Sequence, residues 1–80
     1  MGERFRLHGV EFDTDEIERA HLRRGYTGGE LTIWTRDGEE YCWYIYIRDS
    51  REDHDAYVML KYHTDCYTET WPKRSWGGGG

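Results

Sequence analysis

The sequence predicts an α+β domain: a mostly antiparallel sheet of four to five strands with one helix on one face, in the order β-β-α-β-β-β. Two hairpin signals and one helix start signal support this class. The chain has 80 residues, of which 36% are hydrophobic and 16% are aromatic. A chain of this length holds a single core, so we expect one domain over residues 3–72 and a flexible tail over residues 73–80.

Residues 5–12 are predicted to form an opening hairpin with a two-residue turn at His8-Gly9. The residues that would face each other across this turn match in chemistry, apolar against apolar and basic against acidic. This match favours the two-residue turn. The predicted pairs are Leu7 with Val10, Arg6 with Glu11, and Phe5 with Phe12.

Residues 14–24 are predicted to form the helix. Asp13 can cap its start, Glu16 completes a capping box three residues later, and Gly25 stands just beyond its end. Acidic residues come early and arginines late, which suits the helix dipole. The apolar stripe of this segment is thin, so the helix would need a sheet to pack against.

Residues 30–48 carry the strongest strand signal, a hairpin around Arg36-Asp37-Gly38. A three-residue loop with Gly38 in the left-handed conformation is favoured over a two-residue Asp37-Gly38 loop, because it places the apolar residues together on one face. The predicted core face carries Leu31, Ile33, Tyr41, Trp43, Ile45 and Ile47, and the opposite face carries Thr32, Trp34, Cys42, Tyr44 and Tyr46.

The next segments are predicted from the alternation of apolar and polar residues. Residues 48–55 contain no apolar residue and are expected to be a solvated acidic loop. Residues 56–63 alternate as a strand does, which would turn Tyr57 and Met59 toward the same face as Trp34. Residues 64–71 would extend that strand or return as an edge strand.

No catalytic or metal-binding motif is present. The histidines and the two cysteines lack the spacing of a CxxC or HExxH site, so we expect no metal, no cofactor and no enzymatic activity. Cys42 and His63 would lie on neighbouring strands, but nothing supplies the third group that a nucleophilic pair needs. Both cysteines are expected to be reduced, and the chain is expected to be cytoplasmic because it contains no long apolar run.

The favoured hypothesis is a non-enzymatic protein-binding module, for example a phage or mobile-element inhibitor of a host complex. It would act through an aromatic sheet face and the acidic loop, because aromatic residues are enriched at interfaces and carboxylates suit a basic partner. A homodimer through the same face is an alternative, and the net charge of −5 argues against nucleic acid. The expected contact residues are Trp34, Tyr44, Tyr46, Tyr57, Met59, Asp49, Glu52, Asp53 and Asp55.

Three other interpretations stay open. The aromatic face, with basic residues at its margins, could bind single-stranded nucleic acid. The four terminal glycines and the hairpin-helix-strand order are similar to ubiquitin-like modifiers and sulfur carriers, which end in Gly-Gly; this similarity would imply activation of the Gly80 carboxylate. The aromatic face could also be covered by Trp71, Trp76 or the opening hairpin, in which case it would be part of the core.

Overall fold

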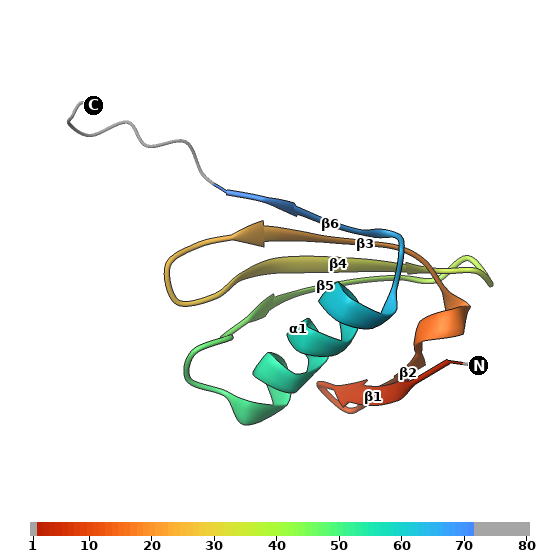
Figure 1. Ribbon diagram of the computed structural model, residues 1–80, viewed down its shortest axis with the longest axis horizontal. Helices are drawn as coiled ribbons and strands as arrows, with labels where there is room; N and C mark the ends of the chain where they lie inside the picture. Colours follow the sequence, from red (N-terminus) through yellow and green to blue (C-terminus); the bar gives the residue numbers. More distant parts are fainter. Residues whose placement is uncertain (1, 72–80) are drawn as a thin grey trace.

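The computed structural model describes residues 2–71 and confirms the α+β class (Figure 1). The predicted tail over 73–80 and Trp76 lie outside the described residues. Among residues 2–71 there is one α-helix, and no helix is long and apolar enough to cross a membrane. The elements are β1 (Arg4–Leu7), β2 (Val10–Asp13), the 3₁₀ turn η1 (Thr14–Glu16), β3 (Ile17–Arg24), β4 (Gly29–Thr35), β5 (Glu40–Ile45), α1 (Arg51–His63) and β6 (Tyr67–Thr70).

The strands form a two-stranded hairpin, β1-β2, and a four-stranded sheet in the order β5-β4-β3-β6. Strands β3, β4 and β5 are antiparallel neighbours, while β6 pairs with β3 in parallel. The larger sheet is therefore mixed. The chain passes through α1 between β5 at one edge of this sheet and β6 at the other (Figure 1).

Helix α1 and the β1-β2 hairpin lie side by side on the same face of the four-stranded sheet, which we name the inner face (Figure 1). Apolar side chains from all three units meet there, which is the burial that a small domain needs for stability. The ring of Phe12 on β2 packs edge-on against Tyr41 and Trp43 of β5, with centroids 5.2 and 6.0 Å apart. The buried core consists of Phe5, Leu7, Phe12, Ile17, Ala20, Leu22, Leu31, Ile33, Ile45, Ile47, Ala56 and Leu60.

The opening hairpin is confirmed with its predicted register: Leu7 opposite Val10, Arg6 opposite Glu11, and Phe5 opposite Phe12. The turn residues His8 and Gly9 both have positive φ, 52° and 81°. Two positive φ values are the requirement of the two-residue turn that matches strand twist. The hairpin covers the inner face, so it does not cover the opposite face of the sheet.

The register of the second hairpin is confirmed as well. Leu31 lies opposite Trp43 and Ile33 opposite Tyr41. The amide of Thr35 donates to the carbonyl of Glu39 over 2.9 Å, which closes a three-residue loop whose last residue, Gly38, has a φ of 95°. The division of this ribbon into an apolar face and an aromatic polar face therefore follows the prediction.

The helix predicted over residues 14–24 is wrong. The Asp13 side chain does accept a hydrogen bond from the amide of Asp15, at 2.9 Å, but the cap starts only the short turn η1. The chain then continues as β3, because pairing with both β4 and β6 satisfies its backbone and buries its few apolar residues. A bulge between Ile17 and Arg19 shifts the register, so the strand lacks a regular alternation of period two.

The predicted loop over residues 48–55 and the predicted strand over residues 56–63 are also wrong, because residues 51–63 form α1. The Ser50 hydroxyl accepts a hydrogen bond from the Asp53 amide at 3.2 Å and caps the helix. Asp53, Ala56 and Leu60 are buried, and their spacing is that of one helix face.

The helix follows the fifth strand rather than the second, so the chain order is β-β-β-β-β-α-β. The element order on which the similarity to ubiquitin-like modifiers and sulfur carriers rests is therefore not found. The terminal glycines, which supply the other part of that similarity, lie outside the described residues.

Candidate protein-binding face

The outer face is the side of the four-stranded sheet opposite α1 and the β1-β2 hairpin, and among residues 2–71 no element packs over it (Figure 1). Strand register decides which side chains lie on it, since paired residues point to the same side of a sheet. Paired residues of this kind form a continuous row of side chains across all four strands. The outer face is formed by Glu40, Cys42 and Tyr44 of β5, Glu30, Thr32 and Trp34 of β4, Arg19, His21 and Arg23 of β3, and Thr68 and Thr70 of β6.

Two tyrosines give this face its largest exposed apolar area. Tyr44 is 49% exposed, and Tyr46, which directly follows β5, is 51% exposed. Their rings contact each other edge-on with centroids 5.0 Å apart. An edge-on pair of this kind is a favourable arrangement of two aromatic rings.

Trp34 is partly buried on the outer face because a cation covers it. The guanidinium of Arg19 lies over the Trp34 ring, 4.3 Å from its centroid. The predicted helix over residues 14–24 hid this contact, since it placed Arg19 away from the sheet. A strand in this segment was indicated by one sequence pattern. Polar residues alternate with Ala20 and Leu22 in the second half of β3, at positions 19, 21 and 23.

Polar side chains on β3 and β6 are bonded to one another. The Nδ1 atom of His21 lies 2.8 Å from the hydroxyl of Thr68, and its Nε2 atom lies 3.2 Å from the hydroxyl of Thr70. The Thr32 hydroxyl donates to the Cys42 sulfur at 3.5 Å. Both ring nitrogens of His21 therefore have protein partners. Within residues 2–71, no group of three or more His, Cys, Asp or Glu side chains is placed to hold a metal ion.

The cysteines do not form the pair with histidine that the predicted strand would have allowed. Cys42 lies on the outer face, whereas His63 ends α1 on the other side of the sheet, where it lines a groove beside β1. Cys66 is half-buried, with its sulfur 3.6 Å from the carbonyl oxygen of Ile17. Both cysteines are free thiols.

The prediction that Tyr57 and Met59 share a sheet face with Trp34 is wrong. Both belong to α1 and are half-buried against the core. The Tyr57 ring meets Tyr67 of β6 edge-on, with centroids 6.3 Å apart. The misplacement follows from the strand predicted over residues 56–63.

The predicted acidic loop does not exist as a continuous surface. Asp49 is exposed before the helix, while Glu52 and Asp55 are exposed on its first turns. Asp53 is only 3% exposed, and its carboxylate accepts the Tyr46 amide hydrogen bond at 2.7 Å. Asp53 thus stabilises the fold and is inaccessible to a partner.

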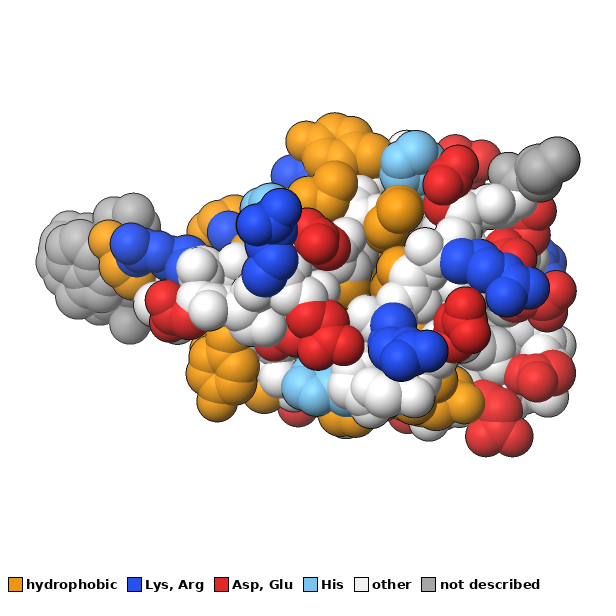
Figure 2. All heavy atoms as spheres, turned by 90° about the horizontal axis from the view of Figure 1, so that it is seen from below, with side chains coloured by type: hydrophobic (Ala, Val, Ile, Leu, Met, Phe, Trp, Pro, Cys, Tyr) orange, Lys and Arg blue, Asp and Glu red, His pale blue; other side chains and the backbone are white. Residues whose placement is uncertain are grey.

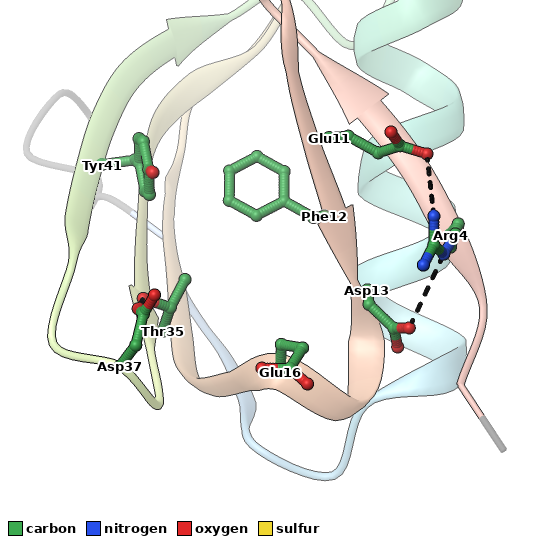
Figure 3. A pocket seen from close by; sticks show the side chains of 8 residues that line it. All are labelled: Arg4, Glu11, Phe12, Asp13, Glu16, Thr35, Asp37 and Tyr41. Atoms are coloured by element: carbon green, nitrogen blue, oxygen red, sulfur yellow. Dashed lines mark hydrogen bonds and ion pairs between the residues drawn. The ribbon is translucent and has the colours of Figure 1, made fainter.

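Carboxylates gather instead at the end of the molecule that holds η1 and the β4-β5 turn (Figure 2). A hollow of about 280 Å³ opens there between the β1-β2 hairpin and β5 (Figure 3). Arg4 reaches Glu11 at 3.5 Å and Asp13 at 3.8 Å. The lining residues come from separate parts of the chain, so no local sequence motif predicted the hollow. They are Arg4, Glu11, Phe12, Asp13, Glu16, Thr35, Asp37 and Tyr41.

In comparisons with known proteins, no family model, no curated protein and no solved structure matches this chain.

Proposed function

We propose that this protein is a non-enzymatic protein-binding module that docks through its outer face, centred on Trp34, Tyr44 and Tyr46. The observation that carries the proposal is that α1 and the β1-β2 hairpin both cover the inner face, so that within residues 2–71 no helix or strand packs over these aromatic residues. Tyr, Trp and Arg are the residue types that contribute most to binding at protein interfaces.

The charges of the outer face favour a folded protein as partner. Arg19 and Arg23 stand beside Glu30 and Glu40, so the face carries as many acidic as basic side chains on β3, β4 and β5. A mixed face of this kind offers no continuous track for a phosphate backbone. A protein with apolar pockets for the tyrosines and a polar rim matches it better. Inhibition of a host complex is the specific form of docking that we favour.

The proposal predicts that replacing both outer tyrosines, Tyr44→Ala with Tyr46→Ala, reduces capture of the partner by roughly tenfold or more. The measurement is a pull-down from extract of the source cell, with quantification of each captured protein. Tyr62→Ala is the matched control, because Tyr62 is 69% exposed but belongs to α1. Circular dichroism should show the same folded spectrum for the double variant and for the control.

Equal capture by the double variant and the unmodified protein would contradict the proposal. A loss of capture in the Tyr62→Ala control of the same size would also contradict it, since the effect would then not belong to the outer face. Light scattering tests the remaining case, a homodimer through the outer face. In that case the unmodified protein would have the mass of a dimer and the double variant the mass of a monomer.

A second candidate, binding of single-stranded nucleic acid, is favoured by one observation. Arg19 stacks on Trp34, and ring-cation pairs of this type also stack on bases. Two cations expected at the margin of this face do not strengthen the candidate: Arg36 donates to the Asp15 carbonyl at 2.8 Å, and Lys61 lies on α1.

The nucleic-acid candidate is tested by fluorescence anisotropy with a labelled thymidine oligonucleotide at low salt. Binding that weakens steeply with salt, and that is lost in Arg19→Gln, would support it. Unchanged anisotropy at protein concentrations far above those of the pull-down would exclude it and leave the protein-binding proposal untouched.

A further inference from the structure

Two cations converge on one phenol oxygen where β3, α1 and β6 meet. The Arg24 guanidinium donates from Nη1 to the Tyr57 hydroxyl at 2.9 Å. The Lys61 ammonium, one helical turn after Tyr57, donates to the same oxygen at 3.1 Å. This cluster lies on the side of the sheet that carries α1, so it is separate from the outer face.

Aromatic rings hold both cations in place. The Arg24 guanidinium lies over the Tyr57 ring at 5.0 Å and over the Trp71 ring at 4.9 Å. The Lys61 nitrogen lies 5.4 Å from the Tyr57 centroid and 5.8 Å from that of Tyr62. Stacking on aromatic faces restricts the motion of a planar guanidinium.

The hydrogen bonds of this cluster are incomplete. The Tyr57 oxygen accepts from both cations, so its own proton needs an acceptor, and the part of the chain described here supplies none. The Nε atom of Arg24 is buried without a hydrogen-bond partner within that same part. Lys61 uses one of its three donors on Tyr57.

The carboxylate of Glu69 acts on Lys61 through its charge, but within residues 2–71 it forms no hydrogen bond or ion pair with Lys61 or Arg24. Glu69 accepts a hydrogen bond from the Tyr67 hydroxyl at 2.6 Å. Burial, together with this hydrogen bond, raises the pKa of Tyr67 above the ordinary tyrosine value, so Tyr67 stays a neutral donor to Glu69. The pKa of Lys61 is raised above the ordinary lysine value, mainly by its hydrogen bond to Tyr57.

We propose that Arg24, Tyr57 and Lys61 form a binding site for a phosphate monoester. The three groups offer a guanidinium, a hydroxyl and an ammonium donor around one point, and a phosphate monoester offers three acceptor oxygens and close to two negative charges. The dianion neutralises both cations and accepts the free Tyr57 proton. A carboxylate, with two oxygens and one charge, satisfies fewer of these donors. The site goes beyond the outer face and does not depend on it.

The test is a titration of the ¹⁵N-labelled full chain with inorganic phosphate, followed by two-dimensional NMR, with sodium chloride added to hold the ionic strength constant. We expect saturable shifts confined to the second half of α1, the end of β3 and β6. Acetate at the same ionic strength should bind more weakly. Parallel titrations with O-phosphoserine and with uridine 5′-monophosphate distinguish a phosphorylated side chain from a nucleotide as the source of the phosphate.

The variants Lys61→Gln and Tyr57→Phe should each weaken phosphate binding by roughly tenfold, because each removes one hydrogen bond to a charged group. Arg51→Gln is the matched control, since Arg51 is an exposed cation at the start of the same helix. Lys61 is exposed, so Lys61→Gln is expected to fold even if Tyr57→Phe does not.

Three results would overturn the proposal: shifts that do not saturate, equal affinity for acetate and phosphate, or unchanged affinity in Lys61→Gln. None of these results bears on the pull-down with the outer-face variants, so the two proposals stand or fall separately.

Discussion

Replacing Ile33 with alanine is expected to lower the free energy of unfolding by about 3 kcal/mol, since removing three buried methyl or methylene groups leaves a cavity. Ile33 is fully buried at the centre of β4, between Ala20 of β3 and Tyr41 of β5. Domains of this size have about 5–15 kcal/mol in total, so the loss is a large share. Urea denaturation followed by circular dichroism measures it.

The matched control is Thr32→Val, one residue earlier on the same strand but on the outer face. Valine keeps the β-branched shape, and the change is expected to stay within about 0.5 kcal/mol. Equal losses for Ile33→Ala and Thr32→Val would contradict the assignment of the two faces, and with it the proposed docking surface.

Replacing Asp53 with alanine is expected to lower the free energy of unfolding by about 1–3 kcal/mol, because the change leaves the partly buried amide of Tyr46 without its acceptor. The Asp53 carboxylate accepts the Tyr46 amide hydrogen bond, while the Asp53 amide donates to the Ser50 hydroxyl at the helix start. His8 in the opening hairpin lies 3.7 Å from the same carboxylate. The Asp53 side chain thus joins the residue that follows β5, the helix α1 and the β1-β2 turn.

Thermal unfolding of Asp53→Ala beside Asp55→Ala tests this role. Asp55 lies two residues later on the exposed side of the helix, where its contacts are with Arg51 and His54. Exposed ion pairs contribute little to stability, so Asp55→Ala should unfold close to the temperature of the unmodified protein. Similar melting temperatures for the two variants would show that Asp53 has no special role.

The sequence predicted the structural features that depend only on residues close together in the chain. Both hairpins have the expected register, because His8-Gly9 and Gly38 adopt the positive φ angles that their turns need. The outer positions of Trp34 and Tyr44 follow from that register. Local turn chemistry and strand parity were sufficient for these features.

The misplaced helix has two physical causes. Residues 14–24 carry a good cap at Asp13, but pairing with strands distant in sequence outweighs it, and the bulge after Ile17 hides the strand pattern. In residues 56–63, alternating apolar residues imitate a strand, although the Ser50 cap and the buried Ala56 and Leu60 fit a helix.

The parts of the sites that could not be predicted are those that need distant segments. The contact of Arg19 with Trp34, the acidic hollow and the cluster around Tyr57 each combine residues from at least two elements. No spacing within one segment encodes such a combination. For the cluster around Tyr57, the segments are brought together by the packing of α1 and by the parallel pairing of β3 with β6.

That parallel pairing joins residues 47 positions apart, His21 with Thr68 among them. During synthesis, β3 is made before β4, β5 and α1, and one of its edges has no partner strand until β6 has been made. Closure of long loops slows folding, so β6 is expected to join last. A nascent chain released before Tyr67 would carry an open strand edge that invites aggregation.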